Sequence, residues 1–243
     1  MGKKYSKEEI IKKLEVAKSE MGQFYSENFL NYIGETLDKK GDYTEIIAGW
    51  LLDNIELFEE IKPITREKNY KVDSHDGKIK NEKSNREEEK IAMKIFDLSQ
   101  NQGKVFDIIG KIIDYQTPLK NVQTDDVGKI DLLAYNENEN GRTLRILELK
   151  KSDSKETMLR CVLEAYTYLK IVDKVKLLKD FGLPEDTTIK ACPFVFYNGE
   201  QHKEMKEMKE IKDSRKNLKD LIKELGIEVI YLEEKDGEYS IVK

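Results

Sequence analysis

An acidic and a basic residue lie two positions apart inside an apolar run, TLRILELKK, at residues 143–151. The run alternates with period 2, as a strand does, so Ile146, Glu148 and Lys150 are expected to share one face. A carboxylate and an ammonium on a partly buried strand are costly unless a partner, a metal or a substrate matches them. The pair therefore indicates a functional site or, on an exposed face, a strand ion pair of little energetic weight.

A second strand-like run at residues 128–135 carries one aspartate, Asp131, near its start. The sequence NENENGR separates the two runs and is a strong turn signal. The two runs are therefore predicted to form a β-hairpin that brings Asp131 close to Glu148. Two carboxylates and Lys150 at one point suit a site for a metal ion and a phosphate, although Asp131 could instead simply cap a turn.

Glu88 is a further acidic candidate, at the start of a helix that Ser84 and Glu87 are expected to open as a capping box. It precedes the apolar residues Ile91 and Ile95 by three and seven positions, so it lies nearest the inward face. The alternative is an ordinary first-turn acid that the helix dipole favours.

Three other side chains are weaker candidates for contacts to a ligand. Gln116 lies in the strand expected next to Asp131 and could point toward it, or could be satisfied by its neighbours within the sheet. Arg160 and Tyr168 flank Glu164 at a spacing of four on a later helix. That face could line a substrate groove or could be solvated.

The composition describes a soluble globular protein of 243 residues with 37% charged residues and a net charge of −5. No run of about 18 apolar residues is present, and the start MGKKYSKEEIIKK lacks the apolar centre of a secretory signal, so a cytoplasmic protein without membrane association is expected. The two cysteines and two histidines are isolated, which argues against a zinc site. The net acidity argues against a protein that coats nucleic acid broadly, but not against a local basic groove.

The expected elements alternate between helices and strands after a helical beginning. Residues 1–62 are assigned to a helical accessory region, 63–83 to a polar and mobile linker, and 84–243 to the main domain. The pattern predicts an α/β fold with a mixed sheet covered on both faces. The expected elements of the main domain are a helix from 84, strands at 111–119, 128–135 and 143–151, a helix at 156–170 capped by Asp153 with Glu156, a strand at 187–197, a helix at 200–225 and strands at 228–233 and 239–242.

These residues resemble the PD-(D/E)XK nuclease superfamily, which has a restriction-endonuclease-like αβββαβ core. The resemblance covers about half of the chain and is carried by Asp131, Glu148-Leu149-Lys150 and the capped helix that follows. Ile130 stands where the name-giving proline would be. Glu164 stands where the RecB-like members carry the glutamine of a Gln-x-x-x-Tyr signature that Tyr168 would complete.

The resemblance implies metal-dependent hydrolysis of phosphodiester bonds in nucleic acid, DNA in particular, with Mg²⁺ or Mn²⁺ as cofactor. Asp131, Glu148 and the carbonyl of Leu149 would hold the metal, Glu88 would assist, and Lys150 would orient the attacking water. Burial is expected to lower the pKa of Lys150. Many relatives form homodimers to cut two strands. The alternative function is a catalytically idle binding or scaffold protein that keeps the nuclease fold.

Overall fold

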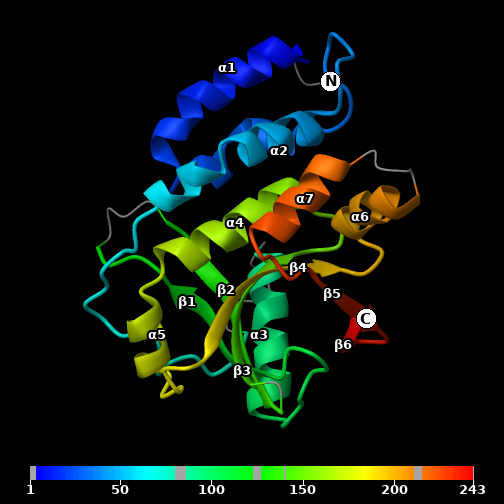
Figure 1. Cartoon of the computed structure of the whole chain (residues 1–243). Helices are drawn as coiled ribbons and strands as arrows, with labels where there is room; N and C mark the ends of the chain where they lie inside the picture. Colours follow the sequence, from blue (N-terminus) through cyan, green and yellow to red (C-terminus); the bar gives the residue numbers. More distant parts are fainter. Residues whose placement is uncertain (1–3, 80–85, 123–126, 140, 211–214, 243) are drawn as a thin grey trace.

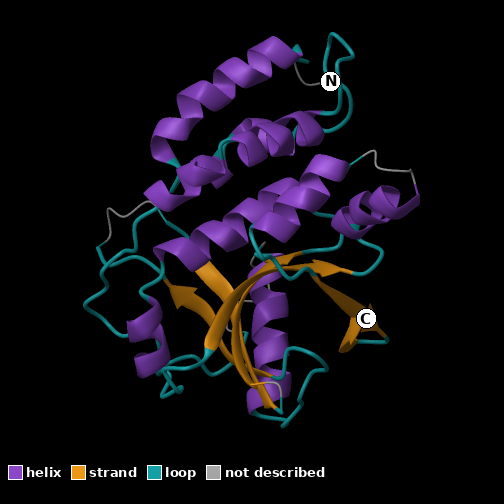
Figure 2. Ribbon diagram, in the orientation of Figure 1, coloured by secondary structure: helices purple, strands orange, loops and turns teal. Residues whose placement is uncertain are grey.

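The computed structural model describes residues 4–79, 86–122, 127–139, 141–210 and 215–242. Six strands form one mixed sheet in the order β1-β2-β3-β4-β5-β6 (Figure 2). The first three pair antiparallel, β3, β4 and β5 run parallel, and β6 returns antiparallel to β5. The strands are β1 (Lys111–Pro118), β2 (Lys129–Asn138), β3 (Gly141–Lys150), β4 (Thr188–Phe196), β5 (Ile230–Lys235) and β6 (Glu238–Val242).

Helices cover both faces of this sheet, as predicted (Figure 1). Helix α3 (Glu87–Gln100) packs on one face and contributes Ala92 and Ile95 to an apolar core there. Helix α4 (Met158–Ile171) packs on the other face against β3 and β4, because its sequence places apolar residues along one side. The chain is therefore an α/β protein with a mixed sheet between helical layers.

The N-terminal helices form an outer layer over α4 and α7 (Figure 1). Their apolar side chains, such as Leu30 and Leu51, belong to the same continuous core as Leu133 and Ile146 of the sheet. Ser6 and Glu9 form the expected reciprocal capping box at the start of α1. The helical elements outside α3 and α4 are α1 (Lys7–Ala17), α2 (Tyr43–Asp53), α5 (Lys174–Asp180), α6 (Glu200–Glu210), α7 (Lys216–Glu224) and the short 3₁₀ helices η1 (Lys18–Glu20), η2 (Phe24–Ser26), η3 (Asn28–Asn31) and η4 (Ile55–Glu60).

Several expected helices differ in the structure. The helix after β3 begins at Met158 with Thr157 as its cap, so the prediction of an Asp153 and Glu156 cap is wrong; Thr157 accepts from the N–H of Arg160. The charged stretch at 200–225 contains two helices, since Arg215 has non-helical backbone angles. Helix α5 has no counterpart among the expected elements. Ser84, of the second expected capping box, lies outside the described residues.

The polar stretch assigned as a linker is held at a few points where it is described, at residues 63–79. Tyr70 is fully buried, and its N–H donates to Asp180 at 2.8 Å. Its hydroxyl accepts from the N–H of Asp173, so both ends of α5 hold it. Further along, His75 Nδ1 lies 2.6 Å from Asp114 Oδ1 of β1. Most residues of this segment are exposed, as expected, but Tyr70 and His75 tie it to α5 and β1.

Candidate active site

The β2–β3 hairpin places the predicted acids and lysine at one end of the sheet. Leu132 pairs with Leu147, so the next residues toward the open end are Asp131 and Glu148. Side chains of β3 alternate as expected. Ile146 belongs to the core under α4, while Leu147 and Leu149 belong to the core under α3. Glu148 and Lys150 therefore point toward α4.

Asp131 joins three strands through its two carboxylate oxygens. Gln116 of β1 donates to Oδ1 at 2.8 Å, and the backbone N–H of Leu149 donates to Oδ2 at 2.9 Å. The Leu149 N–H therefore bonds to a side chain of β2, where a regular sheet would offer it a backbone carbonyl of β2. Within a strand the N–H and C=O of one residue point toward the same neighbour. The carbonyl of Leu149 therefore points from β3 toward the side of β2, where Asp131 lies.

Lys150 is the centre of a buried ionic cluster. Its Nζ lies 2.9 Å from Glu148 Oε1, 2.9 Å from Glu164 Oε2 and 3.0 Å from Glu156 Oε2. Glu148 is 4% exposed and Lys150 6%. An exposed strand pair, the alternative for these two residues, is thereby excluded. The other oxygen of Glu148, Oε2, is buried without a hydrogen-bond partner among the described residues.

Burial and like charge shape the titration of this cluster. Burial raises the pKa of Asp131 from 3.8 to about 6. The pKa of Glu148 is raised well above its usual value, mainly by burial and secondly by the negative charges of Asp131 and Glu164. Burial alone would lower the pKa of Lys150, but the carboxylates around it, Glu148 first, raise it well above 10.5. The expected lowering is therefore wrong, because three neighbouring acids outweigh the desolvation.

Glu88 lies at the same end of the sheet on α3. Its Oε1 accepts from the N–H of Lys151 at 3.0 Å, directly after the ionic cluster. Glu88 and Asp131 both line a cavity of about 370 Å³, together with Gln116 and Lys129. Glu88 is thus brought to the site, whereas Glu87 pairs with Lys151 Nζ at the surface.

Tyr168 and Arg160, the two helix residues expected to touch nucleic acid, instead contact acids of the Lys150 cluster. Tyr168 is 3% exposed, and its hydroxyl donates to Glu164 Oε1 at 3.1 Å. Its ring packs edge-on against Tyr25 of η2, so it is enclosed by protein. Arg160 lies 3.2 Å from Glu156. The alternative prediction, that this side of the helix is exposed to solvent, is also wrong, because Glu164 is buried.

Three residues around the cluster are not predicted from the sequence: Glu156, just before α4, and Glu164, on α4, contact Lys150, and Tyr25 of η2 contacts Tyr168. The sequence places Glu156 in a helix cap and identifies Glu164 only as a departure from a signature. The spacing of four between Glu164 and Tyr168 was the available signal. No local pattern connects Tyr25, more than a hundred residues earlier, with the same cluster.

The donor set fits a hard divalent cation. Among the described residues, no three acidic, histidine or cysteine side chains form a ready-made metal cluster. Mg²⁺, however, is commonly held by one or two carboxylates, with water and substrate phosphates completing its shell. One oxygen of Glu148 has no partner among the described residues, and burial makes the ionised form of Asp131 costly, so a cation beside the two carboxylates would be favourable. The contact network holds more acids than bases: Asp131, Glu148, Glu156 and Glu164 against Lys150 and Arg160.

The fold and the site together define an α/β protein with a buried acid–lysine cluster at the open end of a β-hairpin. Comparisons with protein-family models, with curated proteins and with solved structures find no match. Within the described ranges, no helix combines the length and apolar character needed to cross a membrane.

Proposed function

We propose that this protein is a nuclease that hydrolyses phosphodiester bonds in nucleic acid with Mg²⁺ or Mn²⁺. The observation that carries the proposal is the convergence of Asp131, Glu148 and Lys150, with one buried oxygen of Glu148 left without a partner among the described residues. A buried carboxylate oxygen of this kind is costly unless a cation or proton matches it.

The order of elements supports a core of the PD-(D/E)XK type. Helix α3, the antiparallel strands β1 to β3, helix α4 and the parallel strand β4 occur in the αβββαβ order of that superfamily, with the short helix α5 added between α4 and β4. Asp131 belongs to the second of these strands and Glu148 and Lys150 to the third, as the resemblance requires.

Asp131 and Glu148 would hold the ion, with the carbonyl of Leu149 at the same edge. When bound, the ion would supply positive charge that stabilises the developing negative charge on the phosphate. Lys150 remains protonated because Glu164 and Glu156 keep their contacts to it. Its role is therefore that of a fixed cation beside the phosphate and the attacking water, not that of a base.

A binding or scaffold protein without catalysis is the second candidate, and one observation favours it. Asp131 lines the cavity of about 370 Å³, whereas neither Glu148 nor Lys150 does. Catalysis therefore requires that substrate or metal reach these two side chains through the Asp131 side of the cluster. A scaffold would need no such access.

Cleavage assays with linear, circular and single-stranded DNA and with RNA, in Mg²⁺ and in Mn²⁺, test the proposal. Lys150→Met should reduce the rate by about 10²- to 10³-fold, as loss of one fixed charge does at comparable sites. Lys111→Met, at the exposed start of β1, is the matched control and should keep full activity. Circular dichroism checks that both variants fold.

Lys150→Met leaves the buried acids Glu148 and Glu164 without their cation, which lowers stability, so Asp131→Asn provides a second test. The asparagine keeps the shape of the side chain but removes the charge. Equal cleavage by the wild type and Asp131→Asn would refute the nuclease proposal. Calorimetric titration with Mn²⁺ separates the candidates further, because a scaffold should show no binding that depends on Asp131.

A further inference from the structure

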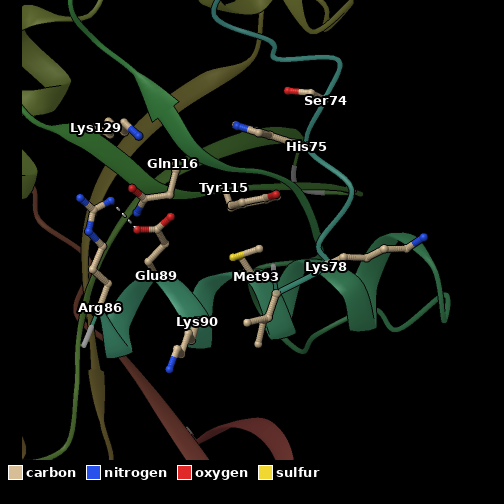
Figure 3. Close-up of a pocket in the computed structure, with 11 residues that line it drawn as sticks. Ser74, His75, Lys78, Arg86, Glu89, Lys90, Met93, Tyr115, Gln116 and Lys129 are labelled. Carbon is tan, nitrogen blue, oxygen red and sulfur yellow. Dashed lines mark hydrogen bonds and ion pairs between the residues drawn. The ribbon is translucent and has the colours of Figure 1, made fainter. Parts of the chain in front are cut away.

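A larger cavity adjoins the acidic site. It has a volume of about 520 Å³ and lies between the segment at 74–79, helix α3 and the strands β1 and β2 (Figure 3). It shares part of its lining with the smaller cavity that Asp131 lines, so the two are neighbours. The shared residues are Arg86, Glu89, Gln116 and Lys129.

The margin of this larger cavity is basic although the protein as a whole is acidic. Lys78, Lys90, Lys129 and Arg86 all contribute to its lining, although the amino group of Lys90 points away from His75 and Tyr115 (Figure 3). Glu89 is the one carboxylate among the described lining residues, and it lies 3.2 Å from Arg86. Lysines spaced around an opening suit a flexible chain of phosphates rather than a single small anion.

Two rings, His75 and Tyr115, lie in the wall of the cavity. The ring of His75 stacks on Tyr115 at 4.3 Å, with 28° between the planes. Nδ1 of His75 lies 2.6 Å from the buried carboxylate of Asp114, which in turn accepts from Thr117. The ring is therefore fixed in place before any ligand binds. A fixed planar ring in a wall of the cavity is suited to stacking on a nucleobase.

Gln116 connects this cavity to the acidic site. It lines both cavities and donates to Asp131. Its backbone has φ of 49°, a left-handed conformation that glutamine rarely adopts. Strain of this kind persists where the surroundings fix a residue, and such residues gather at ligand sites.

We propose that the larger cavity receives an unpaired nucleotide next to the phosphate that is cleaved, which makes single-stranded nucleic acid the substrate class. The base enters beside His75 and Gln116, and the flanking phosphates lie on the lysines at the margin. A base within a duplex is stacked on both sides and cannot enter a pocket of this size, whereas an unpaired base can. This inference rests on the proposed nuclease function for the role of Asp131.

Binding measured without divalent metal tests the inference separately from cleavage. Fluorescence anisotropy in EDTA would compare labelled single-stranded DNA and RNA with the corresponding duplexes. Single strands of one or both kinds should bind at least about tenfold more tightly than duplexes. An abasic strand should bind about tenfold more weakly than the same strand with bases, since stacking of one base contributes about 1–3 kcal/mol.

Charge reversal at the margin identifies the surface used. Lys78→Glu and Lys90→Glu should each weaken binding of the single strand by about tenfold. Each should also make the plot of log affinity against log salt shallower, by about 0.7 in slope for every phosphate that the variant no longer neutralises. Lys94→Glu is the matched control, because Lys94 lies one turn further along α3, is exposed and does not line this cavity. It should bind as the wild type does.

Two results would overturn the inference. One is equal or tighter binding of duplexes, and the other is an equal effect of Lys94→Glu and the two margin variants. Single-strand binding without cleavage in Mg²⁺ or Mn²⁺ would instead refute the nuclease proposal and leave the binding site standing. The two failures are therefore distinguishable.

Discussion

Asp131→Asn is expected to stabilise the metal-free protein at neutral pH while removing the function proposed for it. The folded protein raises the pKa of this carboxyl from 3.8 to about 6, chiefly through burial. A carboxyl whose pKa is higher in the folded state binds its proton more tightly there than in the unfolded chain. The stabilisation by this proton is complete below about pH 4 and is lost as the pH rises through 6.

The size of the effect follows from the shift. A difference of about two pKa units corresponds to about 3 kcal/mol, at 1.36 kcal/mol per unit. The asparagine side chain cannot ionise, so the variant avoids this loss. Removing the charge of Asp131 also relieves Glu148, whose pKa it helps to raise. We therefore expect the variant to be more stable than the wild type, and the difference between their free energies of unfolding to grow by about 1–3 kcal/mol from pH 4.5 to pH 8.

Urea denaturation at pH 4.5, 6 and 8 in EDTA measures this difference. Asp107→Asn, an exposed aspartate in the loop before β1, is the control and should follow the wild-type pH dependence. Adding Mn²⁺ at 100 times its Kd should stabilise the wild type by about 2.7 kcal/mol and the variant by much less. The difference in free energy of unfolding between the two proteins would then become smaller or change sign.

Two outcomes would refute the reasoning. Parallel stability curves for the wild type and Asp131→Asn across the pH range would mean that burial does not perturb this carboxyl. An equal Mn²⁺ effect on both proteins would mean that Asp131 is not a ligand. The second outcome would count against the metal site even if the first prediction held.

Two further predictions concern packing around the site and the segment before it. A Cβ on Gly128 would lie 2.1 Å from the Tyr168 hydroxyl, so Gly128→Ala should lower the free energy of unfolding by about 1–3 kcal/mol. Tyr168→Phe should partly relieve that loss in a double-mutant cycle, and Gly22→Ala, with open space around it, should be harmless; additive effects of the two site changes would contradict the contact. Tyr70→Phe removes the hydroxyl that accepts from Asp173 and should cost about 1–2 kcal/mol in urea denaturation. An unchanged midpoint for Tyr70→Phe would show that the segment at 63–79 is not held at this point.

The hairpin could be predicted from the sequence because its signals are local. Period-2 alternation fixes which side chains of β3 share a face, and the turn residues show that the chain reverses between the two strands. The predicted turn at 136–142 is too long, because β2 continues to Asn138 and β3 begins at Gly141. Register then brings Asp131 to Glu148 without reference to the rest of the chain. The sheet with helices on both faces followed in the same way from the alternation of elements. Local signals define the boundaries of elements less sharply, as the start of α4 at Met158 shows.

The sequence by itself determined the acids and the lysine of the hairpin, because each follows from the spacing of neighbouring residues. Only the tertiary structure decided what surrounds Lys150, since Glu164 on α4 and Glu156 just before it reach the lysine when α4 packs on the sheet. That packing also reversed the expected direction of the Lys150 pKa, which depends on the balance between burial and nearby charge. Distances between elements far apart in the chain set this balance, and no periodicity encodes them. The basic cavity, formed by segments from His75 to Lys129, depends on the fold for the same reason.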